Sequence, residues 1–108
     1  MSALAQHFTA DQTASARLSS LIASHRATLD LAEAYTASIT FAPVAACKRH
    51  WIATYRNRIA GYERRAAQCP TDAGASHALG MLGHNGCGPA IEDLLRSCRF
   101  QASMERAA

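Results

Sequence analysis

The sequence predicts an all-α fold, a small helical bundle with two long antiparallel helices and two short ones. Apolar residues recur at spacings of three, four and seven over two long segments, which is the period of an amphipathic helix. No window alternates apolar and polar residues as a half-buried strand does. Pro43, Pro70 and Pro89 each stand at a predicted helix boundary. We therefore expect one helical domain over residues 1–108.

The first long helix is expected over about residues 9–40. Thr9 and Gln12 fit a capping box, in which each side chain bonds a free first-turn N–H of the other residue. One apolar stripe then runs through the segment; it comprises Ala14, Leu18, Leu21, Ile22, His25, Leu29, Ala32, Thr36 and Ile39. Leu4, His7 and Phe8 are expected in a short preceding turn. The break at Phe41–Pro43 predicts a tight corner and an antiparallel second helix.

The second long helix is expected over about residues 43–69. Pro43 suits a first helical position, where its missing N–H would be unpaired anyway. Pro70 disfavours helical geometry at Cys69 and so ends the helix. The predicted core stripe is Val44, Trp51, Ile52, Tyr55, Ile59 and Tyr62. By this spacing the aromatic residues Trp51, Tyr55 and Tyr62 are expected to be buried.

The two short helices are expected over about residues 72–82 and 89–103. Thr71 and Asp72 offer an N-cap for the third helix, whose Gly74 and Gly80 weaken it by roughly 1 kcal/mol each. Residues 83–89 are rich in glycine and predict a loop. Pro89 would then begin the last helix, with acidic residues in its first turn and a core stripe of Ile91, Leu94, Leu95, Cys98 and Ala102.

The composition predicts a real but thin core. Alanine supplies nearly half of the hydrophobic residues, and Leu, Ile, Val and Phe together make up about a sixth of the chain. Chains of this kind gain stability from crosslinks, metals or oligomer interfaces, and we expect a homodimer. No apolar run reaches the roughly 18 residues of a membrane span. We expect a cytoplasmic protein with reduced thiols and no membrane partner.

Basic residues concentrate in the central helix, although the net charge of the chain is only +3. Residues 48–65 contain six basic residues but only one acidic residue, Glu63. The basic residues are Lys48, Arg49, Arg56, Arg58, Arg64 and Arg65. This pattern predicts binding to an acidic protein surface. The alternative is a nucleic-acid binder without sequence specificity, in which arginines pair phosphates and aromatic rings stack on bases. A helix-turn-helix is disfavoured, because Glu92 and Asp93 would repel phosphate.

Cysteine and histidine residues offer a second alternative, a structural protein stabilised by zinc or disulfides. Cys69, His77, His84 and Cys87 are ligand types that zinc prefers, but only His84 and Cys87 have a usable spacing. No metal or other cofactor is favoured. In an oxidising compartment the expected disulfides are Cys69–Cys98 and Cys47–Cys87. Otherwise the thiols stay unpaired, with Cys98 in the core. His25 is expected in the core and His50 in solvent.

No catalytic motif is present. The eight carboxylates form no evident pair, and neither a nucleophile elbow nor a phosphate loop occurs. The sequence therefore predicts a non-enzymatic interaction module, a small adaptor or inhibitor. Its expected partner-binding residues are Arg49, Arg56, Arg58, Arg64, Arg65, His84 and Asn85.

Overall fold

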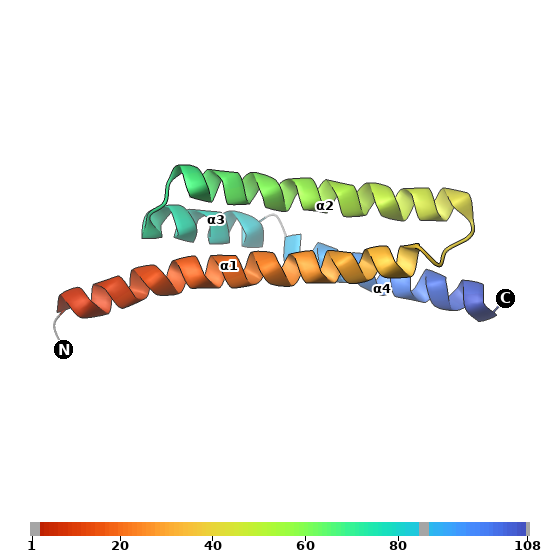
Figure 1. The fold of residues 1–108 in the computed structure, drawn as a ribbon, viewed down its shortest axis with the longest axis horizontal. Helices are drawn as coiled ribbons and strands as arrows, with labels where there is room; N and C mark the ends of the chain where they lie inside the picture. The colour runs from red at the N-terminus through yellow and green to blue at the C-terminus, as the bar shows by residue number, and fades with distance from the viewer. Residues whose placement is uncertain (1–2, 85–86, 108) are drawn as a thin grey trace.

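The computed structural model describes the backbone of residues 3–84 and 87–107 and the side chains of residues 14–83 and 87–107. Within these residues it contains four helices and no strand; the helices are α1 (Ala3–Thr36), α2 (Ala42–Gln68), α3 (Asp72–His84) and α4 (Cys87–Ala107). The predicted fold class is confirmed, with two long helices and two short ones (Figure 1). Of the described helices, none is both long and apolar enough to span a membrane.

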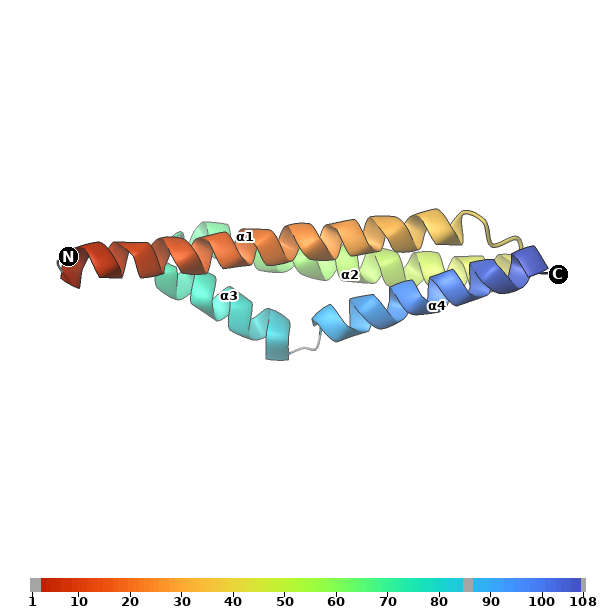
Figure 2. The same ribbon diagram turned by 90° about the horizontal axis from the view of Figure 1, so that it is seen from below.

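The helices form an elongated bundle of 64 × 25 × 18 Å. Helices α1 and α2 are antiparallel, as predicted from their short connection (Figure 1). Helices α3 and α4 follow one another end to end and together run alongside α1 (Figure 2). They do not fold back on each other as the two helices of a helix-turn-helix do. Helix α4 runs antiparallel to α2 and packs more closely on α1 than on α2.

The start of α1 differs from the prediction. The helix begins at Ala3 and continues through Thr9, so the capping box at Thr9 and Gln12 and the separate turn before it are wrong. The residues from Ala3 to Gln6 are alanine, leucine and glutamine, which rank among the best helix formers and extend the helix toward the N-terminus. Downstream all members of the predicted stripe but the half-buried Leu21 are buried. Helix α1 ends at Thr36 rather than at about residue 40, so Ile39 is buried from the connection to α2 and not from the helix.

The buried face of α2 is narrower than predicted. Ala45, Ile52 and Ile59 are buried at spacings of seven, and Tyr62 joins them. Trp51 is 41% exposed, so its predicted burial is wrong. Spacing alone placed Trp51 beside Ile52, but α2 packs with Ile52 and Ile59 at the centre of its contact face. Trp51 therefore lies at the margin of the core.

The core itself joins all four helices. Its fully buried members come from every helix and include Leu29, Ile59, Leu82, Ile91 and Cys98. Thr36 is buried among them, and its Oγ1 donates to the carbonyl oxygen of Ala32 at 2.8 Å. A bond of this kind satisfies a hydroxyl that would otherwise be costly to bury.

The connection between α3 and α4 is shorter than the predicted loop over residues 83–89. Helix α3 continues through His84, and α4 begins at Cys87 rather than at Pro89. Pro89 is tolerated there because a first-turn N–H has no partner within the helix. Glu92 and Asp93 consequently lie beyond the first turn. The predicted cap of α3 is confirmed, since the Gly74 N–H donates to Thr71 Oγ1 at 3.1 Å.

The last turn of α4 holds the corner between α1 and α2, which the sequence did not predict. The Glu105 carboxylate accepts from the Thr40 hydroxyl and from the N–H groups of Thr40 and Phe41, both at 3.0 Å. These bonds lower the pKa of Glu105. Helix α4 therefore continues to Ala107, beyond the predicted end at residue 103, and is tied to the start of α2.

Candidate partner-binding surface

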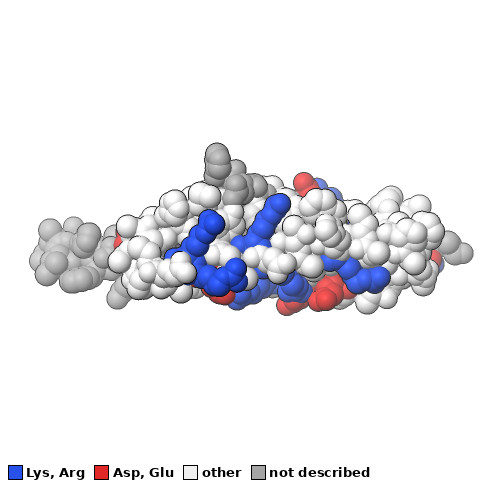
Figure 3. Space-filling view, turned by 90° about the horizontal axis from the view of Figure 1, so that it is seen from above, with Lys and Arg blue, Asp and Glu red and all other residues white. Residues whose placement is uncertain are grey.

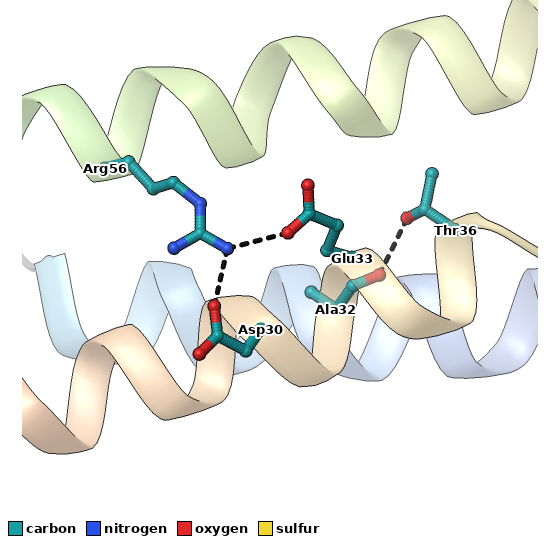
Figure 4. Close-up of polar contacts among 5 residues, drawn as sticks. All are labelled: Asp30, Ala32, Glu33, Thr36 and Arg56. Atoms are coloured by element: carbon teal, nitrogen blue, oxygen red, sulfur yellow. Dashed lines mark hydrogen bonds and ion pairs between the residues drawn. The ribbon is translucent and has the colours of Figure 1, made fainter.

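One edge of α2 faces α1, and Arg56 and Glu63 on this edge are paired with side chains of α1. Arg56 Nη2 lies 2.7 Å from Asp30 Oδ1 and 2.9 Å from Glu33 Oε2 (Figure 4). The hydrogen bond to Asp30 is the main cause of a raised pKa for Arg56. Two carboxylates thus neutralise one guanidinium, which leaves Arg56 less able to attract an acidic partner.

A second ion pair strengthens the same edge. Arg26 on α1 donates twice to Glu63 on α2, with contacts of 3.1 and 2.7 Å. This bidentate geometry is the favourable one for arginine and carboxylate. The edge of α2 that faces α1 therefore carries the one acidic residue of the basic segment, bound to an arginine of another helix.

The other edge of α2 faces α3 and α4 and has a different composition. Basic and aromatic residues are interspersed along it at alternating spacings of three and four. We call this set the aromatic–basic edge; it consists of Lys48, Trp51, Tyr55, Arg58, Tyr62, Arg65 and Cys69. No acidic residue occurs in the set. At 1.5 Å per residue it extends over roughly 31 Å.

Ring contacts order the exposed half of the aromatic–basic edge. The rings of Trp51 and Tyr55 stack with centroids 6.0 Å apart, and His50 meets Trp51 edge-on at 5.4 Å. The Arg58 guanidinium lies 5.4 Å from the centre of the Tyr55 ring, within the range of a cation–π interaction. Lys48 donates to Ser97 on α4. The exposed Trp51 is thus held in place by its neighbours.

Four of the predicted arginines stay unpaired. In the described part of the chain, Arg49, Arg58, Arg64 and Arg65 are exposed and take part in no ion pair. Figure 3 shows their surroundings: Lys and Arg side chains lie across the middle of the face that α2 forms, whereas Asp and Glu side chains gather mainly along the lower margin. Of the five predicted arginines, Arg56 is therefore the one whose charge is neutralised within the described chain, and the other four spread basic charge around the exposed side of α2.

Two hollows adjoin the aromatic–basic edge. One is a cavity of about 200 Å³ between α2 and α3 with an almost wholly apolar lining, which includes Tyr62, Cys69, His77 and Met81. The other, also about 200 Å³, lies over Gly61 between Arg58 and Arg65. An apolar cavity beside free guanidinium groups suits a ligand that has both apolar and acidic groups.

The cysteines and histidines proposed as zinc ligands are only partly brought together. Cys69 and His77 line the same cavity, but Cys87 is buried at the start of α4, where burial raises its pKa and so disfavours the thiolate that binds zinc. The side chain of His84 lies outside the described residues, as does Asn85. No group of three potential ligands occurs among the described residues.

The predicted disulfide pairing is wrong. Because α4 runs antiparallel to α2, Cys98 packs near the N-terminal end of α2, whereas Cys69 follows its C-terminal end. Its neighbour Ser97 accepts from Lys48, while Cys69 lies beside Thr71 at the other end of α2. All four cysteines are free, and Cys98 is buried as predicted, with Thr36 Oγ1 3.4 Å from its Sγ.

His25 and His50, whose side chains the structure describes, lie where they were expected. His25 is 8% exposed, and its ring carbon lies 3.1 Å from the position of a Cβ atom at Gly88. Burial lowers the pKa of His25, although Glu92 counters part of that effect. His50 is exposed on α2. The side chain of His7 lies outside the described residues.

No known protein family, curated protein or solved structure matches this chain. The surface must therefore be interpreted from its own chemistry. Sequence reasoning found its arginines but assigned to the core both Trp51, which is exposed, and Tyr55, which is half-buried against the core. The signal that would have found them is the spacing of three and four that they share with Lys48, Arg58 and Arg65.

Proposed function

We propose that this protein is a non-enzymatic interaction module, a small adaptor or inhibitor, that binds an acidic protein surface through the aromatic–basic edge of α2. One observation carries the proposal: Arg58 and Arg65 have no acidic partner in the described chain, and they share one edge of α2 with the exposed Trp51. Trp, Tyr and Arg dominate the residues that supply most of the binding energy in protein interfaces.

Arg49 and Arg64 extend the proposed surface across the exposed face of α2. Arg56 contributes less, because Asp30 and Glu33 already occupy its guanidinium. His84 and Asn85 remain part of the proposal on the sequence argument alone. A cytoplasmic location and the absence of a cofactor also remain proposals.

A second function, binding of single-stranded nucleic acid, is favoured by one specific observation. Trp51 is 41% exposed and stacks on Tyr55, so a base could stack in turn on its free face. The acidic margin formed by Asp30, Glu33 and Glu63 would restrict a polyanion to the opposite edge.

A titration followed by the fluorescence of Trp51, the only tryptophan, tests both functions. The probes are a poly-L-glutamate peptide and a dT oligonucleotide of equal charge. We expect the Kd for poly-L-glutamate to rise about tenfold or more in the double variant Arg58→Ala with Arg65→Ala. The matched control, Arg17→Ala with Arg106→Ala, removes the same charge from α1 and α4 and should change the Kd by less than about twofold.

The result for the oligonucleotide decides between the two functions. Tight binding of dT that weakens steeply and linearly on a log–log plot against salt would favour the nucleic-acid function, because phosphate contacts release counterions. If neither probe binds, or if both double variants bind as the natural chain does, the proposed surface is wrong.

The expected homodimer is a separate proposal. Phe41, Phe100 and Met104 are all more than half exposed, and the last two lie one turn apart on α4. Light scattering of the natural chain and of a Phe100→Ser variant tests it. A monomer at every concentration would contradict the dimer without bearing on the aromatic–basic edge.

A further inference from the structure

The aromatic–basic edge has the repeat of a coiled-coil seam. Its seven positions alternate spacings of three and four from Lys48 to Cys69. An average period of 3.5 residues keeps such positions in line along a helix, where a second helix can follow them for many turns. A strand or an irregular loop has no matching period. The geometry of the edge therefore selects a helix as its occupant.

The two hollows lie along this seam. The apolar cavity opens beside Tyr62 and Cys69, and the second hollow separates Arg58 from Arg65. Helix α4 packs more closely on α1 than on α2, and α3 and α4 meet at an angle beside the middle of the bundle (Figure 2). Helices α3 and α4 therefore cover only part of the edge: Tyr62 is buried and Lys48 donates to Ser97, whereas Trp51, Arg58 and Arg65, spaced by seven residues, stay exposed.

We propose that the aromatic–basic edge binds an amphipathic α-helix whose seam-facing residues are apolar and acidic in alternation. This inference rests on the proposed function, of which it specifies the partner. Helix-in-groove recognition reads side chains at i, i+3, i+4 and i+7. Carboxylates seven residues apart on the partner face Arg58 and Arg65, which are themselves seven residues apart on α2. An apolar side chain one turn away enters the cavity lined by Tyr62 and Met81.

Charge complementarity excludes a second copy of this chain as the occupant. Two antiparallel copies of the seam centred on Arg58 would bring Arg58 against its own symmetry mate and Arg65 near Trp51 of the other copy. The set contains no acidic residue that could compensate, and like charges across an interface are strongly unfavourable. A partner with carboxylates at the corresponding positions removes this repulsion.

Two synthetic peptides of identical composition test the inference. The first, of about 21 residues, places Glu and Leu in alternation at heptad seam positions with Ala, Gln and Lys elsewhere; the second has the same residues in scrambled order. Neither contains tryptophan, so that Trp51 fluorescence reports binding to both. We expect the heptad peptide to bind about tenfold or more tightly than the scrambled one and to gain helical circular dichroism when bound.

Two single variants of the protein localise the effect. Ala73 lines the apolar cavity, and Ala73→Leu fills it, which should weaken the heptad peptide about fivefold or more. Binding of poly-L-glutamate, which needs no cavity, should not change. The control is Ala46→Leu, the same substitution at an exposed position of α2 outside the aromatic–basic edge; it should leave binding of the heptad peptide unchanged.

The outcomes separate this inference from the proposed function. If both peptides and poly-L-glutamate bind with equal affinity, and binding of all three depends on Arg58 and Arg65, the proposal of an acidic partner is supported and the proposal of a helical partner is wrong. A heptad peptide that binds without gaining helicity also overturns the helix. If no acidic probe binds at all, both proposals fall.

Discussion

The two edges of α2 differ in how their charges are used, although both are basic in sequence. On the edge that faces α1, Arg56 is held by two carboxylates and Glu63 is held by Arg26. On the edge that faces α3 and α4, Arg58 and Arg65 have no acidic partner in the described chain and lie among aromatic rings. The first edge joins α2 to α1 through ion pairs, whereas the exposed arginines of the second edge meet no carboxylate in the described chain.

The difference teaches that a basic segment is not the same as free positive charge. The partners of Arg56 lie 26 and 23 residues away, and the partner of Glu63 lies 37 residues away. Only packing decides which arginines meet them. Four predictions test the contrast between the edges, in order of the expected effect.

The largest effect is expected for Ile59, which is fully buried between the two edges. Ile59→Ala should lower the free energy of unfolding by about 2–5 kcal/mol, because it removes buried methyl groups and leaves a cavity. Denaturant unfolding measures the change. The exposed neighbour Asn57→Ala is the control and should stay within about 0.5 kcal/mol. A small loss for Ile59 would mean that the two edges do not share one core.

A smaller effect is expected at the α2–α3 corner, which sets α3 against the aromatic–basic edge. A Cβ atom at Gly74 would lie 1.9 Å from the carbonyl oxygen of Cys69, whereas one at Gly80 would meet nothing within 4 Å. Gly74→Ala should therefore destabilise the protein by about 1–3 kcal/mol through overpacking. Gly80→Ala should stabilise α3 by about 0.5–1 kcal/mol.

The two glycine variants also sharpen the contrast between the edges. Gly74→Ala should weaken binding of the heptad peptide and leave the Arg26–Glu63 contact of the other edge in place. Thermal unfolding and the Trp51 titration measure these effects. Equal stability of the two variants would refute the close approach at the corner.

The contrast is tested directly by one arginine from each edge. Arg56→Ala should cost about 0.5–1 kcal/mol of stability, since it removes two partly exposed ion pairs. Arg65→Ala removes the same side chain from the unpaired edge and should cost less than about 0.5 kcal/mol. Binding of poly-L-glutamate should show the reverse order.

Salt gives an independent measure of the same difference. In about 1 M salt the Debye length falls to about 3 Å, so the stability difference between the two arginine variants should shrink. Equal destabilisation at low and high salt would show that Arg56 acts through packing rather than through charge.

The smallest effect is expected at Glu105, which ties α4 to the corner between α1 and α2. Hydrogen bonds from Thr40 and Phe41 hold its pKa below the ordinary value of 4.5. Its contribution to stability is therefore present above that value and is lost as the pH falls through the lower pKa of the folded state. The melting-temperature difference between the natural chain and Glu105→Gln should disappear at acid pH. A constant difference for Glu105 would contradict its role.

Much of the fold could be predicted because helical periodicity is a local property. The stripes through Leu18, Leu29 and Ile59 follow from spacing alone, and the Thr71 cap follows from a side chain that bonds its own backbone. The start of α1 was misplaced because a capping signal at Thr9 competed with strongly helix-forming residues before it. The antiparallel order of α2 and α4, and with it the cysteine positions, depended on contacts that no local pattern specifies.

The candidate surface was only partly predictable for the same reason. Sequence determined that α2 carries most of the basic charge, together with the only tryptophan. It could not decide that Trp51 lies outside the core while Ile52 lies inside. The two side chains point about 100° apart around the helix, and only the packing of α2 against its neighbours decides which of these directions faces the core. Nor could it separate Arg56, bound to Asp30 and Glu33, from Arg65, which forms no ion pair with the described residues. The positions of the helices are thus determined largely by residues close together in the sequence. The exposure of an aromatic ring and the pairing of a charge are decided by contacts between segments distant in the chain.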